Sequence, residues 1–205
     1  MNVSQLPLGT GPYWVLGIDP GVKGAIAALR HDLSGHRLLP MPMLERHVDV
    51  VALRAFLCEL RHEGELRFAF IEKAQVMPKQ GGVGNFSYGR SYGTLTTSLE
   101  FMDVPFREIA PSTWKLAVLG AAPSSGRAKS PDPVDKEVAS RARSAAKRAL
   151  KAQSILAARR MFPTAAPFLK SQDGLAEAML IAEASRRFVL SGSMNSDPTI
   201  LKAAA

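Results

Sequence analysis

Four carboxylates stand at positions where acidic side chains are unexpected. Asp19 directly follows the apolar run YWVLGI, and Glu72 directly follows LRFAFI. Both runs are typical of buried strands. Asp173 and Glu177 are four residues apart in a segment with helical spacing, so they share one helix face. We predict that this helix face meets the carboxyl ends of the two strands, where open α/β sheets usually bind ligands.

Carboxylates brought together in this way repel one another and lose solvation. Divalent cations offset that cost, and Mg²⁺ prefers carboxylate and water oxygens. Two ions about 4 Å apart can activate a water molecule and stabilise the leaving oxygen of a phosphodiester. The acidic set therefore predicts metal-dependent phosphodiester hydrolysis. Taken singly, each acid also has a plainer interpretation, as a turn former (Asp19), a strand-end charge (Glu72), a helix N-cap (Asp173) or a helix surface charge (Glu177).

The predicted elements that position these acids begin with strands, after which strands and helices alternate along the chain. We predict strands over residues 13–18, 24–30, 37–39, 66–71 and 105–109. We predict helices over 48–61, 87–101, 135–161 and 171–189, and a further helix that opens at Pro111 with a capping hydroxyl from Ser112 or Thr113. The order predicts an α/β fold, with a mixed five-stranded sheet and helices on both faces.

The same pattern predicts one domain over residues 13–190, with flexible tails at 1–12 and 191–205. A glycine-rich loop is predicted at 79–84 and a mobile loop at 121–134. The helix over 135–161 is either continuous or broken near its middle. Trp114 is expected to belong to the core.

The excess positive charge is confined to one part of the chain. The net charge is +8, and the 46 residues from Lys115 to Arg160 hold eleven basic and three acidic residues. A basic segment of this kind binds polyanions, because each neutralised phosphate releases counterions. We predict that Arg141, Arg143, Lys147 and Arg148 contact DNA. The alternative is a solvated helix face.

Several classes of protein are disfavoured. The longest apolar stretches are too short to span a bilayer, and the first residues do not resemble a signal peptide. A single cysteine, Cys58, excludes an intrachain disulfide and a multi-cysteine zinc cage, so a reducing cytoplasm is the expected setting. A second glycine-rich phosphate hairpin is missing from the sequence, which disfavours an actin-like ATPase and predicts no nucleotide cofactor.

Six segments of the sequence are, in order, GIDPGVKGAIA, FIEKAQ, GGVGNFSYGRSYGTL, PSTWKLAVLG, KAQSILAARRMFP and SQDGLAEAMLIAEA. Taken in this order, they resemble the motifs of RuvC-type Holliday junction resolvases. The last blocks resemble most the branch that contains the chloroplast resolvases of plants and related phage and bacterial proteins. The resemblance spans roughly Val15 to Ala184 and is interrupted by a basic insertion at about 121–149.

The resemblance implies a ribonuclease H-like nuclease, a homodimer that nicks opposing strands of a four-way DNA junction. It implies two Mg²⁺ ions in each active site, with Mn²⁺ as a substitute, held by Asp19, Glu72, Asp173 and Glu177. It also implies a cytoplasmic, nucleoid-associated protein of bacterial or phage origin.

Other residues of the motifs are expected to contact DNA. Lys151 and Ser154 would lie near the scissile phosphate, with Lys151 taking part in catalysis. Phe86 and Tyr88 would touch bases at the crossover, and Lys115 would contact a phosphate. Two alternatives remain open. One is a protein of the same fold that binds DNA without cutting it, and the other is a different ribonuclease H-like nuclease.

Overall fold

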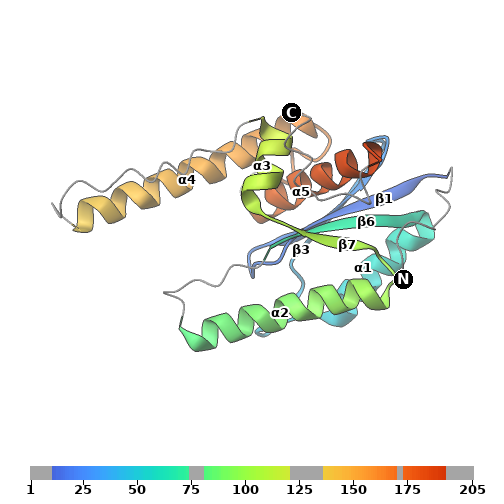
Figure 1. Ribbon diagram of the computed structural model, residues 1–205, viewed down its shortest axis with the longest axis horizontal. Helices are drawn as coiled ribbons and strands as arrows, with labels where there is room; N and C mark the ends of the chain where they lie inside the picture. Colours follow the sequence, from blue (N-terminus) through green and yellow to red (C-terminus); the bar gives the residue numbers. More distant parts are fainter. Residues whose placement is uncertain (1–10, 74–80, 121–135, 170–172, 193–205) are drawn as a thin grey trace.

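The computed structural model describes residues 11–73, 81–120, 136–169 and 173–192. A five-stranded sheet lies between two layers of helices (Figure 1). The strands are β1 (Tyr13–Asp19), β2 (Ala25–Arg30), β3 (His36–Pro40), β6 (Glu65–Glu72) and β7 (Phe106–Ile109), and β4 (Met43–Leu44) with β5 (His47–Val48) form a separate hairpin. The helices are α1 (Val50–Glu63), α2 (Gly82–Phe101), α3 (Pro111–Leu119), α4 (Lys136–Met161) and α5 (Asp173–Leu190). The predicted fold class is confirmed.

The sheet is mixed, with strand order β3-β2-β1-β6-β7. β2 pairs antiparallel with both β1 and β3, whereas β1, β6 and β7 run parallel to one another. The carboxyl ends of the three parallel strands therefore lie at one edge of the sheet. Helices α2 and α4 project beyond that edge, one on each side of the sheet (Figure 1).

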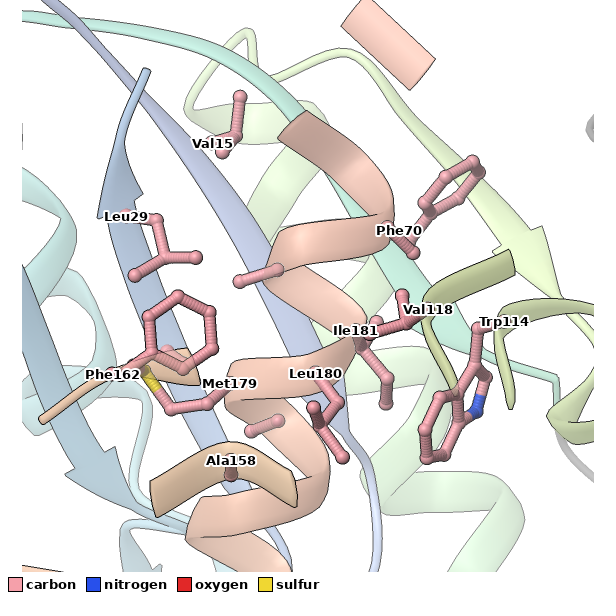
Figure 2. Close-up of a cluster of buried hydrophobic side chains, with 14 of the residues drawn as sticks. Val15, Leu29, Phe70, Trp114, Val118, Ala158, Phe162, Met179, Leu180 and Ile181 are labelled. Atoms are coloured by element: carbon pink, nitrogen blue, oxygen red, sulfur yellow. The ribbon is translucent and has the colours of Figure 1, made fainter. Parts of the chain in front are cut away.

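Alternation along the strands separates two cores. In β1, Val15 packs with residues of α3, α4 and α5, whereas Leu16 packs with residues of α1 and α2. Figure 2 shows part of the first core, in which Leu180 and Ile181 of α5 lie over the sheet and Ala158 of α4 lies beside α5. A side chain that points from α5 toward the sheet therefore packs on the same sheet face as Val15.

Helix α2 begins earlier than the sequence predicts. It starts at Gly82 instead of residue 87 and includes part of the glycine-rich segment that we expected to be a loop. The N–H groups of Gly84 and Asn85 donate to the carbonyl oxygen of Gly81 at 2.9 and 3.1 Å, which closes the first turn. Glycine costs about 1 kcal/mol relative to alanine inside a helix, so intrinsic propensity does not predict this early start, which depends on the hydrogen bonds of the first turn.

Two other expectations about helices are resolved by the structure. The predicted capping hydroxyl of α3 is wrong: the N-cap is Ala110, which makes no side-chain hydrogen bond, and its carbonyl accepts from the N–H groups of Thr113 and Trp114. Pro111 makes a hydroxyl cap less necessary because it removes one of the N–H groups that a helix start leaves unpaired. Helix α4 is continuous.

Some expectations fall partly or wholly outside the described residues. These are the loop at 121–134, residues 79 and 80 of the glycine-rich segment, and the tails at 1–10 and 193–205. Within the described part of the chain, no helix is both long enough and apolar enough to cross a membrane.

Candidate active site

Asp19 and Glu72 end two neighbouring parallel strands. The register pairs Ile18 of β1 with Ile71 of β6, and each acid is the next residue of its strand. Because side chains alternate along a strand, both acids belong to the sheet face that α5 covers. The two strands are neighbours in the sheet, and their carboxyl ends lie together, as the predicted meeting with one helix face requires.

Helix α5 packs on the sheet at backbone contact distance. A Cβ atom built on Gly17 of β1 would stand 2.1 Å from the backbone nitrogen of Ala182. At the start of the helix, a Cβ atom on Gly174 would stand 2.0 Å from the carbonyl oxygen of Lys23, in the turn between β1 and β2. Glycine at both positions is what lets the first turns of α5, with Asp173 and Glu177, approach the end of β1.

The hydroxyl of Ser185 in the same helix forms hydrogen bonds with two strands, β1 and β6. Its Oγ atom donates to the carbonyl oxygen of Leu16 at 2.6 Å and accepts from the N–H of Phe70 at 3.0 Å. Sequence reasoning missed Gly17, Gly174 and Ser185. The available signals were a glycine inside an apolar strand and a serine within the apolar pattern of a helix.

The negative charges of the other three acids all act on the pKa of Asp19. Burial raises the pKa of Asp19 to about 7, and the negative charge of Glu72 adds to the shift. Glu177 and Asp173 raise it further, whereas the N–H of Gly21, 3.2 Å from Oδ1, opposes the shift. The structure therefore brings all four predicted carboxylates into electrostatic contact.

Within the candidate site, the pKa of Glu72 is displaced as well as that of Asp19. Burial raises its pKa, and the charge of Glu177 acts in the same direction. Two neighbours on α3 oppose the shift: Trp114, whose indole Nε1 donates to Oε2 at 2.7 Å, and the ammonium group of Lys115. Trp114 belongs to the core, as predicted, but its polar edge also belongs to the site.

Basic and hydroxyl groups from α3 and α4 engage the two acids of α5. Lys151 forms an ion pair with Asp173, and this hydrogen bond is the main reason that the pKa of Lys151 is raised. Glu177 Oε1 is 3.4 Å from Lys115 Nζ and 3.4 Å from the hydroxyl of Ser154. Lys151, Lys115 and Ser154 therefore lie beside the carboxylates.

The donor set can be tested against a divalent cation. All four carboxylates are described, yet among the described residues no three acidic, histidine or cysteine side chains converge closely enough to form a ready cation cage. The chemistry nevertheless fits, because the donors are hard carboxylate oxygens. Asp19 in addition carries burial and repulsion penalties that a cation would relieve. The lysines supply part of the positive charge that these carboxylates require.

The two aromatic residues predicted to touch bases point in different directions on α2. Phe86 is 74% exposed, on the outward side of the helix. Tyr88 is half-buried, and burial together with the charges of Asp19 and Glu72 raises its pKa to about 12. The charges of Asp19 and Glu72 therefore act on Tyr88, whereas Phe86 is on the surface.

Four of the basic residues predicted to contact DNA lie in the first half of α4, and the fifth, Lys115, lies on α3. Arg141 and Arg148 are exposed, while Arg143 and Lys147 are placed only by their positions in the helix. Lys147 is one turn before Lys151, so the helix leads from these basic positions to the carboxylates.

Solved structures with this fold include two of RuvC. "T. thermophilus RuvC in complex with Holliday junction substrate" matches with a TM-score of 0.52 at 16% sequence identity, covering 88% of this chain and 97% of that one. "Thermus thermophilus RuvC structure" matches with a TM-score of 0.50 at 17% identity, covering 87% of this chain and 96% of that one. No protein-family model matches the chain, and no curated protein matches it. The chain therefore has the ribonuclease H-like fold of RuvC.

Proposed function

We propose that this chain is a metal-dependent endonuclease that resolves four-way DNA junctions. The observation that carries the proposal is the meeting of four carboxylates from β1, β6 and α5 at one edge of the sheet, beside the lysines of α3 and α4. This arrangement combines ligands for hard cations with positive charge for a phosphate. The match to a RuvC structure solved with a Holliday junction supports a branched DNA substrate.

Two Mg²⁺ ions are the proposed cofactors, with Mn²⁺ as a substitute. Asp19, Glu72, Asp173 and Glu177 would together hold these ions. When bound, such ions activate water and stabilise the leaving oxygen of a phosphodiester. Oxygen ligands and water are also the coordination that Mg²⁺ prefers.

The chain's own residues would supply the rest of the mechanism. Lys151 is paired with Asp173, so its ammonium group is already held beside the proposed reaction centre. It would neutralise charge that builds up on the scissile phosphate. Ser154 and Lys115 would orient Glu177 through Oε1.

The DNA would run along the edge of the sheet from which α2 and α4 project (Figure 1). The basic half of α4 would contact phosphates, and the exposed ring of Phe86 would stack on a base of the opened junction. Tyr88 would act closer to the reaction centre than the sequence suggested, because the charges of Asp19 and Glu72 act on it.

Two symmetric nicks require two active sites, so we also propose a homodimer. The outward face of α2 supports this, because it is self-complementary. From Phe86 onward, its exposed residues are Phe86, Gly89, Arg90, Gly93, Thr97, Glu100 and Phe101.

If two copies of α2 cross antiparallel, with the twofold axis on the outward face of the helix at the level of position 95, position i faces position 190 − i of the second copy. Arg90 then faces Glu100, Gly89 leaves room for Phe101, and Gly93 faces Thr97. One helix thus offers opposite charges at matching positions and a small residue opposite a large one.

A synthetic four-way DNA junction with end-labelled strands tests the function. It is compared with a linear duplex of the same sequence, each incubated with Mg²⁺ or with EDTA. Paired symmetric nicks in the junction alone, lost in EDTA, are expected. Equal cutting of the junction and the linear duplex would mean that the protein is a nuclease without selectivity for four-way junctions.

A DNA-binding protein that does not cut is the second candidate. The observation that favours it is that Lys151 and Lys115 already engage Asp173 and Glu177, and no cation cage is preformed among the described residues. Tight junction binding without nicks in either Mg²⁺ or Mn²⁺ would select this candidate.

A further inference from the structure

Helix α3 joins the candidate site through the indole ring of Trp114. The side chain is fully buried, and its Nε1 atom donates to Oε2 of Glu72 at 2.7 Å. In Figure 2 the ring lies near Val118 and Ile181, and its nitrogen points away from the labelled apolar side chains. The ring is therefore fixed by the core, and its donor is directed at a carboxylate at the end of β6.

The next residue of α3 extends the same contact. Lys115 Nζ lies 4.9 Å from the centroid of the Trp114 ring and 3.4 Å from Oε1 of Glu177. Two consecutive residues of one helix thus hold a carboxylate of β6 and a carboxylate of α5. Since Glu72 and Glu177 come from different elements, α3 sets the relation between them.

Core packing alone does not require this hydrogen bond. Trp14 of β1 is also almost completely buried, at 1% exposure, yet its buried Nε1 has no hydrogen-bond partner within the described part of the chain. An indole can therefore fill a core position in this protein without a carboxylate acceptor. The contact at Trp114 differs because it restrains an acid of the candidate site and uses only one of its two oxygens.

We propose that Trp114 is a positioning residue, which holds Glu72 Oε2 and leaves Oε1 oriented to bind a divalent cation. The inference rests on the proposed nuclease function and extends it to a residue outside the acidic set. Groups that orient metal-binding side chains through hydrogen bonds typically contribute about 10- to 100-fold in metal affinity or activity.

The first experiment uses the ¹⁵N-labelled indole groups, of which the chain has two, Trp14 and Trp114. The variants Trp14→Phe and Trp114→Phe assign the two N–H resonances in spectra of the full chain. Both Glu72→Gln and added Mg²⁺ are expected to shift the Trp114 resonance and to leave that of Trp14 in place. A Trp114 resonance that responds to neither change would overturn the inference.

The second experiment measures junction cleavage by the same two variants. Trp114→Phe is expected to lower kcat by about 10- to 100-fold with little change in KM for the junction, and to require more Mg²⁺. Trp14→Phe is the matched control, because it removes an equally buried indole with no carboxylate partner. Equal kcat values for the two variants would overturn the inference.

A third variant separates the N–H group from the volume of the ring. Benzothienylalanine at position 114 keeps the bicyclic shape and replaces N–H by sulfur. The protein with this residue is expected to bind Mg²⁺ as weakly as the Trp114→Phe variant does, while its unfolding temperature stays that of the wild type. Wild-type Mg²⁺ affinity would overturn the inference. If the wild-type chain cuts no DNA, the nuclease proposal fails, whereas the indole resonances still decide whether Trp114 holds Glu72.

Discussion

Gly174, in the first turn of α5, lies directly on the backbone of Lys23 in the turn that follows β1. A Cβ atom at position 174 would stand 2.0 Å from the carbonyl oxygen of Lys23 and 2.8 Å from the Cα atom of Gly24. The distance between the acids of α5 and Asp19 is thus set by a contact between backbones, which cannot yield as a flexible side chain would.

We therefore expect Gly174→Ala to reduce stability. The alanine methyl group must push α5 away from the turn, at a cost of about 2 to 4 kcal/mol in the free energy of unfolding. Urea denaturation measures the loss. Gly82→Ala in α2 is the control, since nothing lies within 4 Å of its added Cβ, and alanine there is expected to be neutral or slightly stabilising. Equal effects of the two substitutions would contradict the close contact.

Asp19→Asn is expected to stabilise the metal-free protein at high pH. The pKa of Asp19 is about 7 in the folded state and near 3.8 when the chain is unfolded, so the folded carboxyl group binds its proton more tightly. The resulting penalty is complete above pH 7, shrinks as the pH falls through 7 toward 4, and vanishes below. The gain in the variant at pH 8 has an upper limit of about 4 kcal/mol.

Denaturation in EDTA at pH 8 and at pH 4.5 checks this pH dependence. Asp103→Asn is the control, because Asp103 is exposed and its φ of 47° suits asparagine. If the gain in unfolding free energy did not depend on pH, or were the same for both variants, ionisation of Asp19 would not be what destabilises the folded protein.

Asp19→Asn and Glu72→Gln should each lower junction cleavage by at least about 100-fold, because each removes a charged metal ligand. Junction binding is expected to remain or to strengthen, because repulsion between the site and the phosphates falls. Single-turnover cleavage and a binding assay on the same junction measure the two effects. Cutting at the wild-type rate by either variant would refute the metal assignment.

The basic half of α4 is expected to determine how strongly salt weakens DNA binding. Changing Arg141, Arg143, Lys147 and Arg148 to alanine should reduce the slope of log K against log salt by up to about 0.9 for each phosphate that is no longer neutralised. Binding measured between 50 and 200 mM salt gives roughly the range needed. Arg159 and Arg160 are the controls, as exposed arginines at the other end of the same helix. An unchanged slope in the fourfold variant would assign this surface to solvent or to a protein partner.

The proposed dimer can be tested by exchanging charges on α2. Arg90→Glu should place two acids opposite each other across the twofold axis and shift the protein toward monomer, as Glu100→Arg should by placing two bases there. The double variant should recover the dimer because the pairs are restored with their signs reversed. Sedimentation at several protein concentrations measures the equilibrium. If both single variants remain as dimeric as the wild type, the interface lies elsewhere.

The order of elements and the identity of the acids could be predicted from the sequence alone. Apolar runs ending at Asp19 and Glu72 marked both strands, because the hydrophobic period and the first polar residue after it are local properties. The spacing of Asp173 and Glu177 likewise placed them on one helix face. The mixed sheet followed from the succession of strands and helices.

The tertiary structure alone decided how these parts meet. The approach of α5 depends on two glycines, Gly17 and Gly174, that touch backbone atoms about 160 and 150 residues away in the chain. The hydrogen bond from Trp114 to Glu72 and the ion pair between Lys151 and Asp173 also join distant segments, for which no local pattern exists. Spacing along a chain reports which face a side chain occupies, whereas its partner is set by packing between elements, and that is why the acids were predictable and their neighbours were not.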